Sequence, residues 1–189
     1  EIFVSSDDPD MLRIATDFRL SPINRPDSLS DERTTTIPVV RHAIEVIEES
    51  RGQISQLCCL YAANPFVEPV HIRDGYQHLV KGHSAFVFSA VEFSYPIERA
   101  FTLDGEDSVH MINSSAYQKR TQDCQRVYHD GDLFYWGQRW AWMHEEAIFG
   151  PRSTALSYPR GSIFPIDNVE DWHRAEAIFE SSKKIRDHD

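Results

Sequence analysis

The stretch YHDGDLFYWG, residues 128–137, is the part of the chain that decides the fold. Its ten residues include a histidine, two aspartates, two glycines and four aromatic residues. A strand that only fills a core needs no acids, and a solvated loop needs no aromatics. The mixture predicts a polar turn at 129–132 followed by a buried strand at 133–136. Binding groups commonly lie on loops positioned by rigid strands, although a hairpin corner with core aromatics would have the same composition.

Upstream of this stretch, apolar patterns typical of strands alternate with patterns typical of helices. Asp8 and Pro9 form a helix start signal, and Gly52 ends the apolar stripe of a second helix. The order strand-helix-strand-helix-strand predicts a parallel sheet covered by helices. The expected strands are 2–4, 57–61 and 85–93; the expected helices begin near residues 8, 36 and 69, with a loop at 22–26.

The second half of the chain has a different character. Residues 99–103 and 109–112 flank a DGED turn and predict a hairpin, and the polar segment 113–126 predicts an exposed excursion. The last helix is expected to begin at Asn168, a candidate N-cap. Its predicted buried stripe comprises Trp172, Ala175, Ile178 and Phe179.

Composition limits the class of protein. The chain has 189 residues, 41% of them hydrophobic, which suits one globular domain spanning residues 1–189. Its net charge of −11 argues against a nucleic-acid partner. No apolar run is long enough to span a membrane. Cys58, Cys59 and Cys124 make no disulfide framework, so we expect reduced thiols and a cytoplasmic location.

Several chemical signatures are absent, and the remaining candidates are open to two interpretations. The chain contains no GxG, GK[ST] or GxSxG motif and no zinc-like histidine spacing. Asp167 precedes the last helix and could bind Mg²⁺ against phosphates or simply assist the Asn168 cap. Arg25 and Arg120 could bind a carboxylate or phosphate as bidentate forks, or be surface residues. His129 could act in acid–base chemistry or be structural.

A series of motifs along nearly the whole chain resembles one family. In order they are VSSDD (4–8), RPDSLSDE (25–32), CCLYAANPF (58–66), FVFSAVEFSYPIERA (86–100), RTQD (120–123), YHDGDLFYWG (128–137), IFGPRS (148–153) and IDNVEDW (166–172). With these motifs the chain resembles the bacterial acylneuraminate cytidylyltransferases, and among them the pseudaminic acid branch.

The resemblance implies an α/β, Rossmann-like three-layer sandwich with a mostly parallel sheet. It also implies a hairpin arm at about 94–128 through which members form homodimers. The implied reaction joins CTP and a nonulosonic acid, here pseudaminic acid, to give the CMP-sugar and pyrophosphate for cell-surface or flagellin glycosylation, with Mg²⁺ as cofactor. By the same resemblance, Asp167 is the catalytic metal ligand. Arg25 and Thr36 contact the nucleotide. The implied sugar-site residues are Tyr61, Arg120, Tyr128, His129, Asp130 and Tyr135, with Arg120 facing the sugar carboxylate.

The chain departs from the family pattern at several points. The family's first strand and its basic loop of the type ARGGSKR are missing, so we expect the first βα unit to be absent. Pro165 stands where members often have an aspartate. The family's LYPTAPF is LYAANPF here, and YHDAGQFYWG is YHDGDLFYWG. These departures keep two alternatives open: a non-catalytic sugar-binding or scaffold remnant, or a cytidylyltransferase for a sialic or legionaminic acid.

Overall fold

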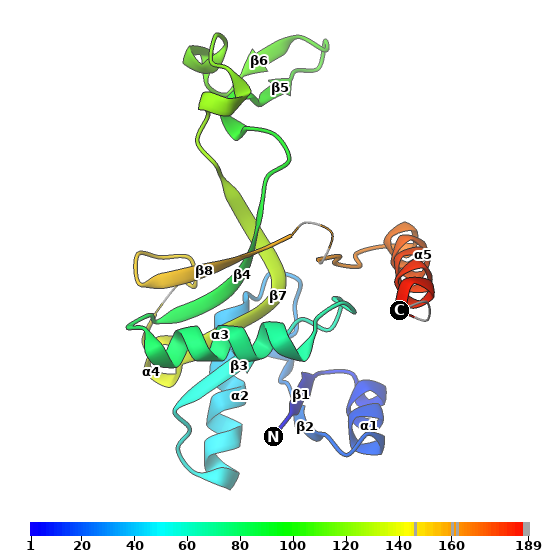
Figure 1. The fold of residues 1–189 in the computed structure, drawn as a ribbon. Coiled ribbons are helices and arrows are strands. Elements are labelled where there is room, and N and C mark those ends of the chain that lie inside the picture. The colour runs from blue at the N-terminus through cyan, green and yellow to red at the C-terminus, as the bar shows by residue number, and fades with distance from the viewer. Residues whose placement is uncertain (146, 160, 162, 187–189) are drawn as a thin grey trace. The chain divides into compact units, whose positions relative to one another are not determined.

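The chain is an α/β protein, and its computed structural model describes residues 1–145, 147–159, 161 and 163–186 (Figure 1). The strands are β1 Phe3–Ser6, β2 Ser21–Asn24, β3 Gln56–Cys59, β4 Phe86–Glu92, β5 Phe101–Leu103, β6 Val109–Met111, β7 Tyr128–Gln138 and β8 Ser153–Tyr158. The α-helices are α1 Pro9–Asp17, α2 Thr36–Arg51, α3 Pro69–Lys81, α4 Arg139–His144 and α5 Val169–Arg186.

The residues group into two compact units. Unit 1 comprises 1–59, 78–87 and 136–154, and unit 2 comprises 60–77, 88–135 and the residues from 155 onward. Strands β4, β7 and β8 each pass from one unit into the other. The assignment of one domain to the whole chain stays a prediction.

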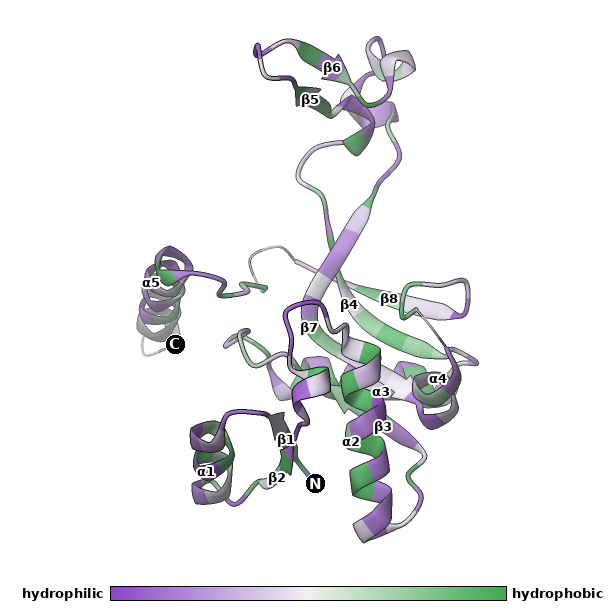
Figure 2. Cartoon of the chain, turned by 180° about the vertical axis from the view of Figure 1, so that it is seen from behind, coloured by the Kyte–Doolittle hydropathy of each residue, from purple (hydrophilic) through white to green (hydrophobic). Residues whose placement is uncertain are grey.

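Three sheets organise the strands. A four-stranded sheet has the order β3-β7-β4-β8, β1 pairs with β2 in parallel, and β5 pairs with β6 as an antiparallel hairpin. The predicted hairpin is therefore confirmed, with Phe101 opposite Met111 and Leu103 opposite Val109. Along β7, the residues change from polar at the Tyr128 end to apolar further along the strand (Figure 2).

The strand β2 corrects the loop predicted around Pro22. Ser21 N–H donates to Ile2 O at 3.1 Å and Arg25 N–H donates to Ser6 O at 2.9 Å. A proline-containing tetrapeptide gives little local indication of a strand. Pairing with β1 across the α1 crossover supplies the order that the local sequence lacks.

Helix ends follow the expected capping signals. The Asp8 side chain accepts from Asp10 N–H at 2.8 Å, and Gly52 ends α2 at a φ of 80°. The apolar stripe predicted for α2 comprises Val39, Val40, Ala43, Ile44 and Ile47. Of these, Val40, Ile44 and Ile47 are buried, and the other two are half-buried. No helix in the described ranges is long and apolar enough to cross a membrane.

The predicted buried stripe of α5 is wrong at two of its four residues. Ala175 is buried, whereas Trp172 and Phe179 are 54% and 57% exposed. The helix start is as expected, because Asn168 Oδ1 accepts from Asp171 N–H at 3.0 Å. Apolar periodicity shows which face of a helix could be buried, but the neighbouring elements decide how much of it is covered.

Unit 1 is held together by contacts between α2 and the segment around α4. Arg139 forms a two-pronged ion pair with Glu48, at 2.6 and 2.8 Å, which holds the pKa of Glu48 below its usual value. Arg41 on α2 donates to the carbonyl oxygens of Trp142 and Glu145, which lie at the end of α4. These bonds satisfy carbonyl groups that a helix end leaves without intrahelical partners.

Gly137 is required by the packing around Trp142. The fully buried Trp142 ring packs edge-on against Phe86, with 4.9 Å between centroids. A Cβ at position 137 would lie 2.8 Å from Phe86 Cδ1 and would also clash with the Trp142 indole. Both neighbours are rigid buried rings, so neither can move aside cheaply.

We therefore expect Gly137→Ala to lower the free energy of unfolding by about 2 kcal/mol through overpacking. Gly150→Ala is the matched control, because a Cβ at position 150 meets nothing within 4 Å. Denaturant unfolding of both variants measures the difference. Equal stability of the two variants would show that the Trp142 packing tolerates a methyl group.

Candidate functional site

The acidic half of YHDGDLFYWG lies inside strand β7 rather than in a turn. Residues 128–138 form one strand, so the turn predicted at 129–132 is wrong. Asp132 adopts a left-handed φ of 53°, and its N–H donates to Asp130 Oδ1 at 3.1 Å. Aspartate tolerates this conformation better than most residues, so the strand accommodates the local distortion without ending.

A buried serine on the neighbouring strand fixes this part of β7. Ser89 on β4 is fully buried, and its Oγ accepts from Leu133 N–H at 3.0 Å. Gly131 permits the close approach, since a Cβ there would lie 2.9 Å from Ser89 Oγ and 2.8 Å from Ile163 Cδ1. The backbone around the two aspartates is therefore held by packing as well as by hydrogen bonds.

The Tyr135 hydroxyl lies between the two aspartates. It is hydrogen-bonded to Asp130 Oδ2 and lies 2.8 Å from Asp132 Oδ1. Tyr135 is 1% exposed, and its ring packs against Tyr61 with 5.2 Å between centroids and 53° between planes. The structure thus brings together three of the predicted sugar-site residues, Tyr61, Asp130 and Tyr135.

Burial controls the protonation of this group. Desolvation raises the pKa of Asp130 above its usual value, outweighing the bonds from Tyr135 and from Asp132 N–H, which lower it. Burial and the two carboxylates also raise the pKa of Tyr135, so the phenol remains a donor. Within the described residues, no cationic side chain forms an ion pair with Asp130 or Asp132.

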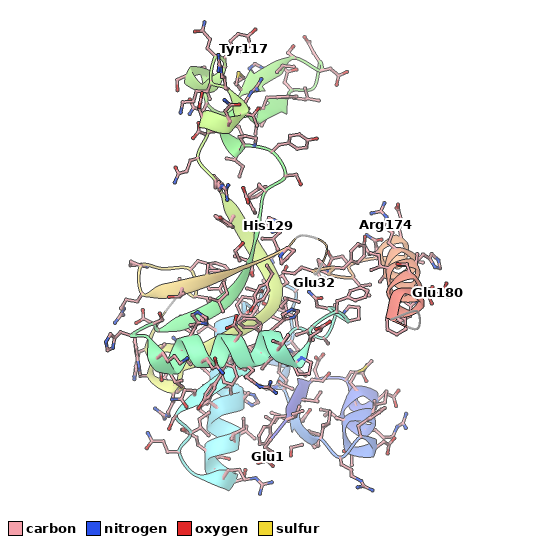
Figure 3. All side chains as sticks on the ribbon, viewed as in Figure 1. Glu1, Glu32, Tyr117, His129, Arg174 and Glu180 are labelled. Atoms are coloured by element: carbon pink, nitrogen blue, oxygen red, sulfur yellow. The ribbon has the colours of Figure 1, made fainter. Side chains whose placement is uncertain are left out.

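His129 and Tyr128 precede this group on β7. His129 Nδ1 lies 2.7 Å from Asp130 O, and its ring contacts Phe93 at 4.9 Å between centroids. Because a carbonyl only accepts, this bond makes Nδ1 the protonated nitrogen and Nε2 the acceptor in the neutral ring. Tyr128 and His129 are both exposed, and Figure 3 labels His129 on the strand.

The loop LYAANPF connects β7 with the segment that leads to Asp167. Asn64 Nδ2 lies 3.5 Å from Asp132 O, and Ala63 O accepts from Ile166 N–H at 2.9 Å. Asp167 is exposed, and its N–H donates to Asp171 Oδ2 at 3.3 Å. Because Asn168 makes the cap bond to Asp171 N–H, the carboxylate of Asp167 is not needed for capping.

The remaining predicted residues lie elsewhere. Arg25 belongs to unit 1, where it donates to Asp7 at 2.6 Å and to Ser30 Oγ at 3.3 Å, and it lowers the pKa of Asp7. Thr36 is the first residue of α2 in the same unit. Arg120 is exposed in the segment between β6 and β7. Among the described residues, no hydrogen bond or ion pair joins its side chain to Tyr135, Asp130 or Asp132.

Reasoning from the sequence did not identify Asp132, Asn64 or Ser89 as site residues. The sequence did contain a signal for two of them: Asp132 stands where the family's YHDAGQFYWG motif has glycine, and Asn64 stands where its LYPTAPF motif has alanine. Their mutual contact joins positions 68 residues apart in the chain. The described residues contain no group of three or more His, Cys, Asp or Glu side chains suited to hold a metal ion.

The fold resembles that of a solved sugar acid synthetase. A solved structure of CMP:2-keto-3-deoxy-manno-octonic acid synthetase complexed with CTP superposes with a TM-score of 0.63 over 96% of this chain and 81% of that chain. The two sequences are 11% identical, so this likeness concerns the fold alone. It confirms the predicted Rossmann-like α/β fold.

Sequence comparison gives the family. The cytidylyltransferase family profile matches residues 1–169. A pseudaminic acid cytidylyltransferase of Campylobacter jejuni serotype O:2 is 34% identical over 95% of this chain and 78% of its own length. A Helicobacter pylori protein named for the same activity and for a UDP-sugar hydrolase is 33% identical over 82% of this chain and 30% of its own length. The chain belongs to the cytidylyltransferase family.

The raised pKa of Asp130 predicts a pH-dependent stability. A carboxyl whose pKa is higher in the folded than in the unfolded state stabilises the fold at low pH. That contribution is lost as pH rises through the folded pKa. We therefore expect the melting temperature of wild type, relative to that of Asp130→Asn, to fall as the pH rises above the ordinary aspartate pKa of about 4. Asp123→Asn, at an exposed aspartate, is the control. If the difference in melting temperature between wild type and Asp130→Asn did not change with pH, the raised pKa of Asp130 would be contradicted.

Proposed function

We propose that this chain transfers the cytidylyl group of CTP to pseudaminic acid, giving CMP-pseudaminic acid and pyrophosphate. The observation that carries the proposal is the 34% identity over 95% of the chain to proteins named for this activity. In this reaction the anomeric hydroxyl oxygen attacks the α-phosphorus, pyrophosphate leaves with the bonding electron pair, and the hydroxyl proton is released. Positioning and charge stabilisation govern such transfers.

The Tyr61–Tyr135 pair and the residues around it suit a sugar. The two rings offer an aromatic surface for the C–H face of a pyranose, and Asp130 offers carboxylate oxygens to its hydroxyl groups. We assign Tyr128 and His129 to the same site because they precede Asp130 on β7 and are exposed. Arg120 is proposed to bind the sugar carboxylate, since an exposed guanidinium can form a bidentate pair with it.

Arg25 and Thr36 are proposed to contact the nucleotide. The Asp7 carboxylate and Ser30 hydroxyl hold the Arg25 guanidinium in place within unit 1. A guanidinium has five N–H donors, so these two bonds leave donors for an anionic ligand. Thr36 lies at the start of α2, where N–H groups and the helix dipole favour anions.

Asp167 is proposed to bind Mg²⁺. Its carboxylate is exposed, is not used for capping, and forms no ion pair or hydrogen bond within the described residues. Mg²⁺ commonly binds one or two protein carboxylates together with substrate phosphates and water, so a single aspartate fits this ion. When bound, the ion would neutralise charge on the phosphates.

We expect Asp167→Asn to reduce pyrophosphate release from CTP and pseudaminic acid by roughly 100-fold or more, because metal-borne charge stabilisation is worth several kcal/mol. Glu170→Gln is the control: it makes the same change of carboxylate to amide at an exposed residue of the first turn of α5. Unchanged release by Asp167→Asn would refute the metal assignment.

A homodimer formed through the arm, about residues 94–128, is also proposed. The arm exposes many apolar side chains, including Tyr95, Phe101, Leu103, Val109, Ile112 and Tyr117, the last of which Figure 3 labels. The register places Phe101, Leu103, Val109 and Met111 on one face of the hairpin. Exposed apolar patches of this kind commonly mark protein interfaces. A cytoplasmic location, where CTP is available, stays a prediction.

We expect Leu103→Glu to shift the protein from dimer to monomer, because it places a charge in the apolar face of the hairpin. Thr102→Glu is the matched control, since Thr102 pairs with His110 on the opposite face. Sedimentation velocity distinguishes the two states. A wild-type monomer, or dissociation by both variants alike, would count against this interface.

A further inference from the structure

The group around the Tyr135 hydroxyl has more acceptors than donors. The phenol supplies one proton to two carboxylates, and Asp132 N–H is already bonded to Asp130 Oδ1. The two aspartates lie beside the buried Tyr135 side chain, and within the described residues neither of them forms an ion pair with a cationic side chain. Buried or half-buried acceptors are normally satisfied, so this group is suited to a ligand that brings donors.

Asn64 gives an independent indication that donors are lacking near Asp132. The residue is 3% exposed, and its Nδ2 lies 3.5 Å from Asp132 O. Its Oδ1 is buried and has no hydrogen-bond partner among the residues that the structure describes. Turning the amide over would place its oxygen against the Asp132 carbonyl, so the observed orientation is the favourable one. Oδ1 is thus an additional acceptor beside Asp132, and a buried unpaired acceptor is costly.

The charge of the group decides which part of a sugar acid it can take. Two aspartates without a cation repel a carboxylate, so the carboxylate end of the substrate is disfavoured there. Hydroxyl and acylamino groups are neutral donors and match carboxylate and amide oxygens. Pseudaminic acid carries acylamino groups and hydroxyls as well as its carboxylate. The acceptors therefore favour an orientation in which the neutral groups face the aspartates and the carboxylate points away from them.

We propose that Asp132, positioned by Asn64, binds the neutral N–H and O–H donors of the sugar and thereby helps to determine which sugar acid is used. This inference rests on the proposed function and extends it to residues that the sequence did not identify. Asp132 accepts directly from the substrate, and Asn64 holds the Asp132 backbone through its Nδ2–H donor.

The first test is Asp132→Gly compared with Asp107→Gly. Both aspartates have left-handed backbones, with φ of 53° and 62°, so glycine fits both positions without strain. Asp107 lies in the β5–β6 turn. We expect Asp132→Gly to raise KM for pseudaminic acid about tenfold or more, with KM for CTP changed by less than about twofold. Asp107→Gly should change neither.

Asp132→Asn and Asn64→Ala complete the test. Asp132→Asn keeps the size of the side chain but replaces one acceptor oxygen with a donor, and it should raise the sugar KM in the same way. Asn64→Ala should raise it less, and unchanged melting temperature and CTP KM would exclude a folding defect as the cause. A sugar KM unchanged in Asp132→Gly and Asp132→Asn would overturn the inference while leaving the proposed function intact. Absence of pyrophosphate release by wild type with CTP and pseudaminic acid would overturn both.

Discussion

The hydrogen bonding of the Tyr135 hydroxyl to two aspartates is the interaction on which the candidate site depends. A buried phenol needs a partner, and two carboxylates close together in a half-buried place repel each other. The single phenolic proton partly relieves both problems. The same arrangement directs Asp130 and Asp132 toward one point and holds the Tyr135 ring against Tyr61. Rigid support of this kind is what positions binding groups accurately.

The left-handed backbone at Asp132 makes this geometry possible. In a regular strand, Asp130 and Asp132 share one face, and Tyr135 would point to the other. The distortion at Asp132 breaks that alternation, and the Asp130 side chain stabilises it by accepting from Asp132 N–H. Ser89 then fixes the strand next to the distortion, because it accepts from Leu133 N–H and packs closely against Gly131. Backbone irregularities inside strands are often found beside functional sites for this reason.

Local features of the sequence predicted the parts of the fold that depend on local interactions. The α1 start at Asp8, the α2 end at Gly52 and the β5–β6 hairpin each depend on residues within a few positions of one another. The strand β2 escaped prediction because its order comes from pairing with β1. The exposure of Trp172 and Phe179 escaped prediction because periodicity does not specify which neighbour covers a helix face.

The sequence by itself determined the family and the α/β class, because ordered motifs and helix signals are properties of short segments. Tyr61, Asp130 and Tyr135 were expected in one site and do lie together. Only the tertiary structure decided that Asp132 and Asn64 belong with them. Their contact spans 68 residues, and the bond from Leu133 to Ser89 spans 44. Contacts at such separations form only when the strands and loops of unit 2 pack, so no local pattern in the chain encodes them.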